Sequence, residues 1–226
     1  MLLADDGRPT GVTWNYTRKE ILADGAVHVV GVALGVAGAI AIVVIAALSP
    51  LSLLERAGVT IYAAGLVSML GVSATYNMWP VSRRKWLLRR ADHALIYLMI
   101  AGTYTPLVAL VGDGLPAWSL LGTVWLVAAI GIALKLLLPG RYDRVSIGLY
   151  LTLGWSGVVA YDAVIGRLGS DAVWMLALGG VLYSLGVVFH VWRSLPYQNA
   201  IWHAFVLAAT ACHYGTVMAT VMGAGA

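Results

Sequence analysis

Long apolar segments separated by short polar breaks run through almost the whole chain. Each has close to the ~20 residues that a helix needs to cross the hydrocarbon core of a bilayer. Their apolar residues do not alternate with period two, which argues against the strands of a membrane barrel. The sequence therefore predicts seven helices, near residues 22–48, 57–79, 91–112, 117–138, 145–165, 172–193 and 199–223.

The breaks between these segments are short and contain residues typical of turns, such as Ser49-Pro50, Pro139-Gly140 and Leu195-Pro196. Short connections make consecutive helices antiparallel neighbours. We therefore expect residues 1–226 to form one all-α integral membrane domain, a bundle of seven transmembrane helices. Residues 1–21 are expected to form a polar N-terminal segment without the features of a cleaved secretory signal.

The composition excludes several classes of function. Hydrophobic residues make up 61% of the chain and charged residues 11%, whereas soluble domains average about 45–50% and about 25%. A soluble enzyme, a disordered chain and a nucleic-acid-binding protein are therefore excluded, and nucleic acid is not an expected partner. The lone cysteine, Cys212, rules out a disulfide framework.

The positive charges predict the orientation of the bundle. If the N-terminus lies in the cytoplasm, twelve of the 14 lysines and arginines fall on the cytoplasmic side, and only Arg56 and Arg167 lie opposite. This asymmetry matches the positive-inside rule. We therefore expect a cytoplasmic N-terminus and a C-terminus on the opposite side of the membrane.

Several helices carry polar residues at membrane depth, where each requires a partner or a function. Pairs four residues apart, which share one helical face, occur on the first, second and seventh helices, and an aspartate opens the third helix. All of them lie near the predicted cytoplasmic ends, which predicts one polar cavity open toward the cytoplasm. The residues expected to line it are Asp24, His28, Ser73, Asn77, Asp92, Asn199 and His203.

Four stretches also carry a resemblance to a known family: EILADGAVH at 20–28, SATYN at 73–77, ADHALIYLMIAGTYTPL at 91–107 and NAIWHAFVLAATACHY at 199–214. In these stretches, and in their order and spacing over nearly the whole chain, the sequence resembles the hemolysin III family. This family is the bacterial branch of the progestin and adipoQ receptor superfamily (PAQR), which includes the adiponectin receptors. The resemblance implies a seven-helix bundle with a cytoplasmic N-terminus, in a bacterial inner (cytoplasmic) membrane.

The resemblance also implies a zinc site near the cytoplasmic side. In eukaryotic relatives one histidine of a Ser-x-x-x-His motif on the second helix and two of a His-x-x-x-His motif on the seventh hold the ion. An aspartate at the start of the third helix, at the position of Asp92 here, supports the bound water. Those relatives are similar to lipid amide hydrolases that act on ceramide, in which zinc activates the water and polarises the amide carbonyl.

This chain departs from that pattern at two of the three ligand positions. Asn77 and Asn199 stand where the family has histidines, and His203 is retained, as are Asp92 and Ser73. An amide oxygen is a poor ligand for zinc, so the sequence offers a degraded zinc site, with His28 the best substitute ligand. Alternatively, the two asparagines join a metal-free polar network with Asp92, His203 and His28.

Three functions remain open. The first is a non-catalytic membrane protein that binds lipid, maintains the membrane or serves as a subunit of a membrane complex, with membrane lipids and other membrane proteins as partners. The alternative is a ceramidase-like, metal-dependent hydrolase of a lipid amide, with Asp92, Ser73 and His203 as its catalytic residues. The third is a pore or cytolysin, which should have polar residues through the full membrane depth, whereas most polar residues here stop in the cytoplasmic half.

Overall fold

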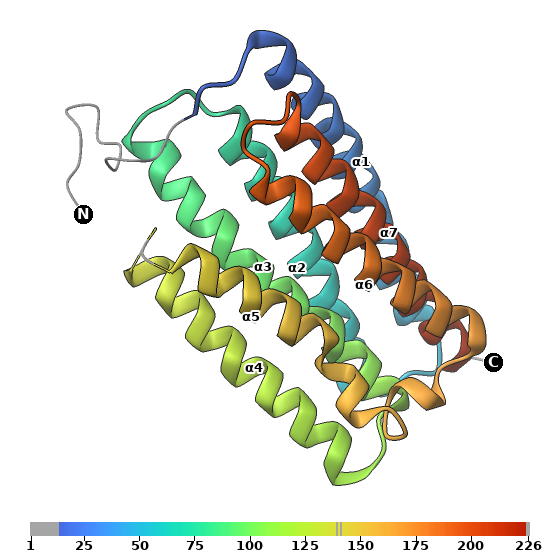
Figure 1. Cartoon of the computed structure of the whole chain (residues 1–226). Helices are drawn as coiled ribbons and strands as arrows, with labels where there is room; N and C mark the ends of the chain where they lie inside the picture. Colours follow the sequence, from blue (N-terminus) through green and yellow to red (C-terminus); the bar gives the residue numbers. More distant parts are fainter. Residues whose placement is uncertain (1–13, 139, 141, 225–226) are drawn as a thin grey trace.

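The chain folds into a bundle of helices, seen in a computed structural model that describes residues 14–138, 140 and 142–224 (Figure 1). No strand occurs within these residues. The α-helices are α1 (Arg18–Leu48), α2 (Leu53–Met78), α3 (Arg83–Val111), α4 (Gly114–Leu137), α5 (Asp143–Trp155), α6 (Ser170–Val191) and α7 (Gln198–Ala224). Two short 3-10 helices, η1 (Ser156–Ala160) and η2 (Ile165–Arg167), connect α5 to α6.

Length and composition mark six of the described helices, all except α5, as long and apolar enough to cross a membrane. The shorter apolar stretch Val145–Ala160 covers most of α5 and all of η1. The predicted all-α membrane bundle is therefore confirmed, and the chain is a multi-pass membrane protein. The orientation of the bundle across the membrane stays a prediction.

Several helices begin at an earlier residue than hydropathy predicts, because polar side chains cap their first turns. Thr17 and Glu20 form a capping box at the start of α1, and Ser52 and Glu55 form another at the start of α2. The Ser82 hydroxyl caps α3, which begins at Arg83 instead of near residue 91. The first turns of these helices are polar, so a search for apolar runs does not include them.

The fifth helix ends before the predicted residue 165. After Trp155 the chain continues as 3-10 helix η1, because the Tyr104 hydroxyl on α3 accepts a hydrogen bond from the Gly157 amide (2.7 Å) and donates one to the Gly154 carbonyl (3.0 Å). These bonds satisfy backbone groups that the break releases inside the bundle, where water is scarce. The prediction of one continuous helix over 145–165 was therefore wrong.

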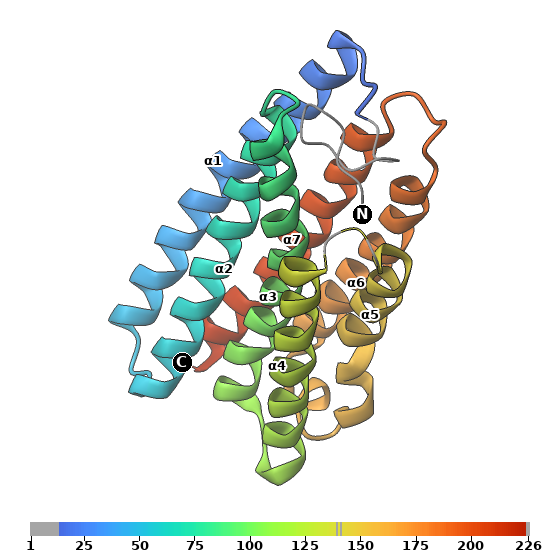
Figure 2. The same ribbon diagram turned by 90° about the vertical axis from the view of Figure 1, so that its left-hand side faces the viewer.

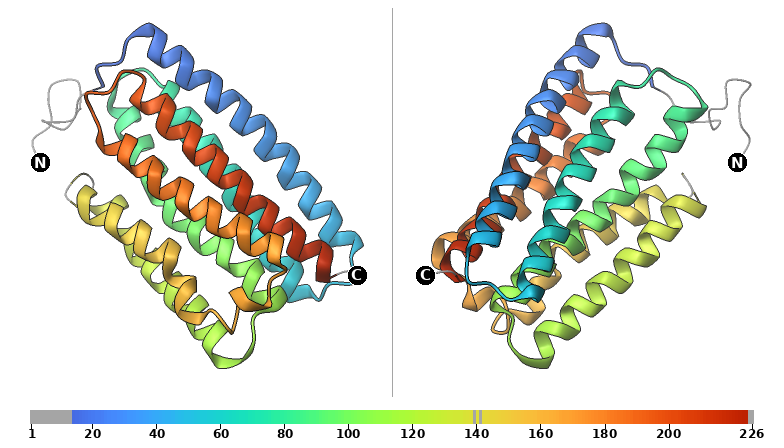
Figure 3. Two further views of the ribbon diagram at one scale, coloured as in Figure 1. Left: turned by 45° about the vertical axis from the view of Figure 1, so that its right-hand side comes forward. Right: turned by 180° about the vertical axis from the view of Figure 1, so that it is seen from behind.

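Helix α3 packs between α2 on one side and α4 on the other, and α6, α7 and α1 form a second row beside them (Figures 1 and 2). Tyr97 of α3, which is fully buried, packs its ring directly over Gly131 of α4. The first residues of α1 and the last residues of α7 lie at opposite ends of the bundle (Figure 3), as an odd number of antiparallel helices requires.

We use "basic end" for the end of the bundle where α1, α3, α5 and α7 begin and α2, α4 and α6 end (Figures 1 and 3). Most of the lysines and arginines within the described residues lie there. Residues 1–13 of the predicted polar segment, and with them Arg8, fall outside the described residues, as does Arg141. The remainder of that segment enters α1 at Arg18.

Candidate functional site

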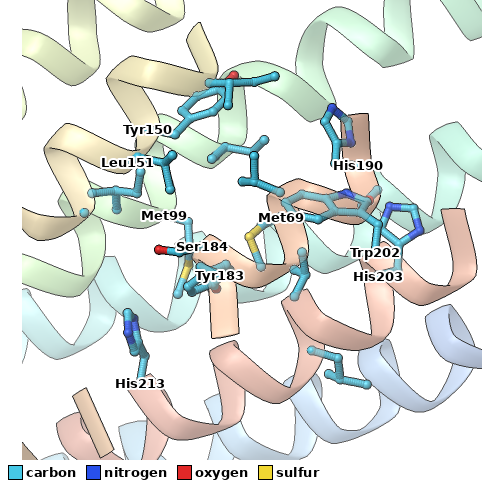
Figure 4. A pocket seen from close by; sticks show the side chains of 18 of the residues that line it. Met69, Met99, Tyr150, Leu151, Tyr183, Ser184, His190, Trp202, His203 and His213 are labelled. Carbon is cyan, nitrogen blue, oxygen red and sulfur yellow. The ribbon is translucent and has the colours of Figure 1, made fainter. Parts of the chain in front are cut away.

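A cavity of about 1100 Å³ opens inside the bundle, bounded chiefly by α2, α3, α5, α6 and α7 (Figure 4). At the basic end its lining is polar and includes Ser73, Asp92 and His203. Farther in, the lining is largely apolar. The apolar side chains there include Met69, Met99, Ile100, Leu107, Leu151 and Leu176. The cavity is therefore amphipathic along its length.

The Asp24 carboxylate is the centre of a polar cluster at the basic end. Its Oδ1 lies 2.6 Å from His203 Nδ1, and its Oδ2 accepts a hydrogen bond from Asn199 Nδ2 at 2.8 Å. Asn199 Nδ2 also donates to Asn77 Oδ1 at 3.0 Å. His28 Nε2 lies 3.7 Å from Asp24 Oδ2, and the His28 and His203 rings are 4.4 Å apart. We call these five residues the Asp24 cluster.

Helical spacing explains why α1 and α7 each contribute two members. Asp24 and His28 lie four residues apart on α1, as do Asn199 and His203 on α7, so each pair occupies one face. Asp24 and His28 are only 3% and 6% exposed. A buried carboxylate requires hydrogen-bond donors, and α7 supplies them to Asp24.

The asparagine and the serine of α2 face the same end of the cavity. Asn77 Nδ2 donates to the Ser73 carbonyl (2.9 Å), and Asp92 of α3 lines the same cavity as both. Asp92 and Ser73 line the cavity together with Asn77, Asn199, His28 and His203. Six of the seven residues expected to line the polar cavity are found there, whereas Asp24 is not in the lining and contacts Asn199 and His203 instead.

Asn77 and Asn199, at two of the family's three ligand positions, do not fit zinc. The Asn199 amide directs its Nδ2, a hydrogen-bond donor, toward both Asp24 and Asn77. The oxygen of Asn77 is occupied as an acceptor. These direct contacts take up the groups that would otherwise surround an ion shared by α2 and α7.

Two buried cations, Lys135 and Arg89, which both contribute to the predicted orientation of the bundle, also line the cavity. Lys135 Nζ and Arg89 share the two oxygens of Asp143, at 2.6 and 2.8 Å. Their side chains are 6% and 11% exposed. The sequence did contain a signal for the place of Lys135 in the cavity. Lys135 lies in the last turn of an otherwise apolar helix, and charges inside spanning segments usually face a partner or a cavity.

A short segment before α1 closes part of the basic end. Trp14 Nε1 donates to the Tyr76 hydroxyl at 3.0 Å, and Trp14 and Tyr16 both line the cavity. Burial raises the pKa of the Tyr16 hydroxyl, although Arg193 beside it acts in the opposite direction. Tyr16 therefore stays neutral at physiological pH and contributes no charge to this end of the cavity.

A second polar group lies deeper, about 15 Å along α7 from His203 by helical rise (Figure 4). The Tyr183 hydroxyl of α6 shares a 2.7 Å hydrogen bond with Thr210, and the His213 ring packs edge-on against Tyr183. Tyr183 and His213 line the cavity. The depth of His213 could be predicted from the sequence, but the place of Tyr183 in the site was missed.

Comparison with known proteins identifies the relatives of this chain. The family described as Haemolysin-III related matches residues 16–214. The chain is 32% identical over 203 residues to a Hemolysin-3 homolog of Bacillus subtilis, covering 90% of this chain and 95% of that protein. It is 31% identical over 204 residues to Hemolysin-3 of Bacillus cereus, covering 90% and 93%. It is also 35% identical over 168 residues to the human monocyte to macrophage differentiation factor, covering 71% and 68%.

Proposed function

The chain belongs to the hemolysin III family, and on that premise we propose that it is a non-catalytic, lipid-binding protein of a bacterial inner membrane. The observation that carries this proposal is the amphipathic cavity of about 1100 Å³. Ligand sites of about 300–1,000 Å³ enclose drug-sized molecules, so this cavity has room for a long acyl chain. The protein would act through the lipid that it holds, in membrane homeostasis or as a subunit of a membrane complex.

The two regions of the cavity match the two parts of a lipid. A polar head group would lie at the basic end, near Ser73, Asp92 and His203, and the acyl chain would extend along the apolar lining that includes Met99 and Leu151. The acyl chain is already surrounded by hydrocarbon in the bilayer, so van der Waals packing rather than removal from water would hold it in the cavity. The polar residues at one end then fix the direction in which the lipid lies.

The non-catalytic role is supported by the contacts at the family's ligand positions. Asn77 and Asn199 hydrogen-bond each other, and Asn199 bonds Asp24. These amides leave the family's zinc position without the three-histidine donor set that the family resemblance implies.

A photoactivatable long-chain fatty acid with a diazirine in its tail tests lipid binding. After irradiation of the detergent-purified protein, peptide mapping should find the label on α3, α5 and α6 residues that line the cavity, such as Met99 and Leu151. An excess of unlabelled oleate should remove it. Labelling confined to the outer face of the helices, or unaffected by oleate, would contradict the proposal.

Two neighbouring residues of α6 provide a matched pair of variants for this experiment. Ala177 lines the cavity, so Ala177→Trp should fill part of it and reduce the specific labelling. Leu178 is 52% exposed on the outer face of the bundle, so Leu178→Trp adds the same side chain where lipid already surrounds the helix. Equal labelling of the two variants would contradict binding inside the cavity.

A metal-dependent lipid amide hydrolase is the second candidate. The observation that favours it is that Asp92, Ser73 and His203 all line the polar end of one cavity. It predicts release of fatty acid from a short-chain ceramide by the purified protein, and loss of that release in Asp92→Asn. Asp113→Asn, at an exposed ion pair with Arg167, serves as the control that should retain activity.

A further inference from the structure

The two histidines of the Asp24 cluster and its carboxylate lie close enough to hold a metal ion at a position that the family pattern does not provide. We propose that Asp24, His28 and His203 form a divalent metal site in which α1 supplies two of the three protein ligands. Zinc is the first metal to test. The site replaces the ligands lost at Asn77 and Asn199, and it is expected whether or not a lipid occupies the cavity.

The positions of the ligand atoms support this site. Asp24, His28 and His203 each offer one ligand atom, and these three atoms lie within 4.8 Å of one another. Zinc binds histidine nitrogens and carboxylate oxygens at about 2.0–2.2 Å, so one ion can contact all three with small movements of the side chains. Two residues come from one helix, and only His203 must be brought in from α7.

One atom of this group has no partner. His28 Nε2 is buried and makes no hydrogen bond within the described residues. Buried polar atoms are nearly always paired, and Asp24 Oδ2 lies 3.7 Å away, beyond hydrogen-bond distance. A metal ion beside Asp24 would satisfy this nitrogen.

The donor set is of the kind that transition metals prefer. Two imidazoles and one carboxylate occur in catalytic zinc sites and in non-heme iron sites, which keep an open position for water or substrate. His28 and His203 also line the cavity, so the open position of an ion held here would face a bound lipid. An oxygen of that lipid, or a water, would complete the coordination.

Without a metal, two of the three proposed ligands, Asp24 and His203, are joined by a hydrogen bond. Asp24 Oδ1 and His203 Nδ1 are 2.6 Å apart, the distance of a charge-assisted hydrogen bond. A metal that uses both atoms must displace the proton between them, so binding releases a proton. Asn199, which donates to Asp24 Oδ2, would then orient the carboxylate from outside the ligand set.

Metal content measured by inductively coupled plasma mass spectrometry tests the site. The full-length protein, purified in detergent without chelator, incubated with zinc sulfate and desalted, should carry about one zinc per chain. His28→Gln and Asp24→Asn should lower the zinc retained at a fixed free zinc concentration by about tenfold or more. A wild-type protein that retains no metal would overturn the proposal.

Two further variants distinguish this site from the remaining histidines and amides of the cavity. His190→Gln changes another buried histidine that lines the cavity and has an unpartnered Nδ1, and it should keep the zinc. Asn77→Ala alters the family's ligand position and should also keep it. Zinc retained in His28→Gln, or lost equally in His190→Gln, would overturn the assignment.

Thermal unfolding provides a readout that does not depend on expression or yield. Zinc should raise the Tm of the wild type and of His190→Gln, because a ligand that binds only the folded state stabilises it. The same zinc should leave the Tm of His28→Gln unchanged even if that variant is less stable than the parent. A zinc-dependent shift of equal size in His28→Gln would count against α1 as a source of ligands.

Discussion

Replacing Asp24 with leucine tests whether its carboxylate holds α1 against α7. Asp24 is 3% exposed and accepts hydrogen bonds from His203 Nδ1 and Asn199 Nδ2. Leucine has the same branched shape, with two larger methyl groups in place of the oxygens and no acceptor. Asp24→Leu therefore leaves two N–H groups without an acceptor, that of His203 Nδ1 and one of the two on Asn199 Nδ2, whose other bond goes to Asn77.

The expected loss of stability follows from those two donors. Each buried donor left unsatisfied costs about 1–3 kcal/mol, which brackets the total between about 2 and 6 kcal/mol. Two effects reduce it: the desolvation penalty of the carboxylate disappears, and His203 and Asn199 line the cavity, where water can replace part of the lost bonding. We therefore expect Asp24→Leu to lower the free energy of unfolding by about 3 kcal/mol.

Asparagine at the same position should have a smaller effect. Asp24→Asn keeps one oxygen acceptor and turns an amide donor toward the other donor, so about 1–2 kcal/mol is expected. Unfolding in mixed micelles of dodecyl maltoside and SDS, followed by circular dichroism with EDTA present, measures both variants without a metal contribution. Asp113→Leu, whose carboxylate is 61% exposed, is the control. An Asp24→Leu variant within about 0.5 kcal/mol of the parent would refute the reasoning.

Three further variants test the packing around the cavity. Asp143→Asn weakens the pairing of two buried cations and should cost about 1–2 kcal/mol, seen as faster proteolysis near the start of α5; an unchanged cleavage rate would contradict this. Gly131→Val would overlap the buried Tyr97 ring and should lower stability by about 1–3 kcal/mol in the same micelle titration, whereas Gly131→Ala should cost less. Tyr104→Phe removes the acceptor of the Gly157 amide and should speed hydrogen exchange there; exchange at the parental rate would show that this bond does not hold the end of α5.

The helices could be predicted because an apolar run long enough to cross a membrane can form few structures other than a spanning helix. What the runs could not show were contacts between distant elements. Ser82 begins α3 in a polar stretch, and the hydroxyl of Tyr104, some fifty residues away along the chain, ends α5. Both boundaries depend on polar groups rather than on hydropathy.

The polar cavity residues were predicted from their shared depth and their four-residue spacing. The central place of Asp24 was not, because its contacts with Asn199 and His203 span 175 and 179 residues and depend on how α1 packs against α7. Lys135 was likewise interpreted as an orientation signal, since a single sequence does not show that its ammonium turns inward to Asp143. Spacing thus predicts which residues share a face, and packing decides which of them meet.

Native mass spectrometry of the protein released from its own membrane measures the central claim directly. The wild type and Leu178→Trp should keep a co-purified lipid through mild activation in the gas phase, and Ala177→Trp, which fills the cavity, should lose most of it. Bare protein in all three spectra, or equal lipid in both tryptophan variants, would contradict a lipid held inside the bundle.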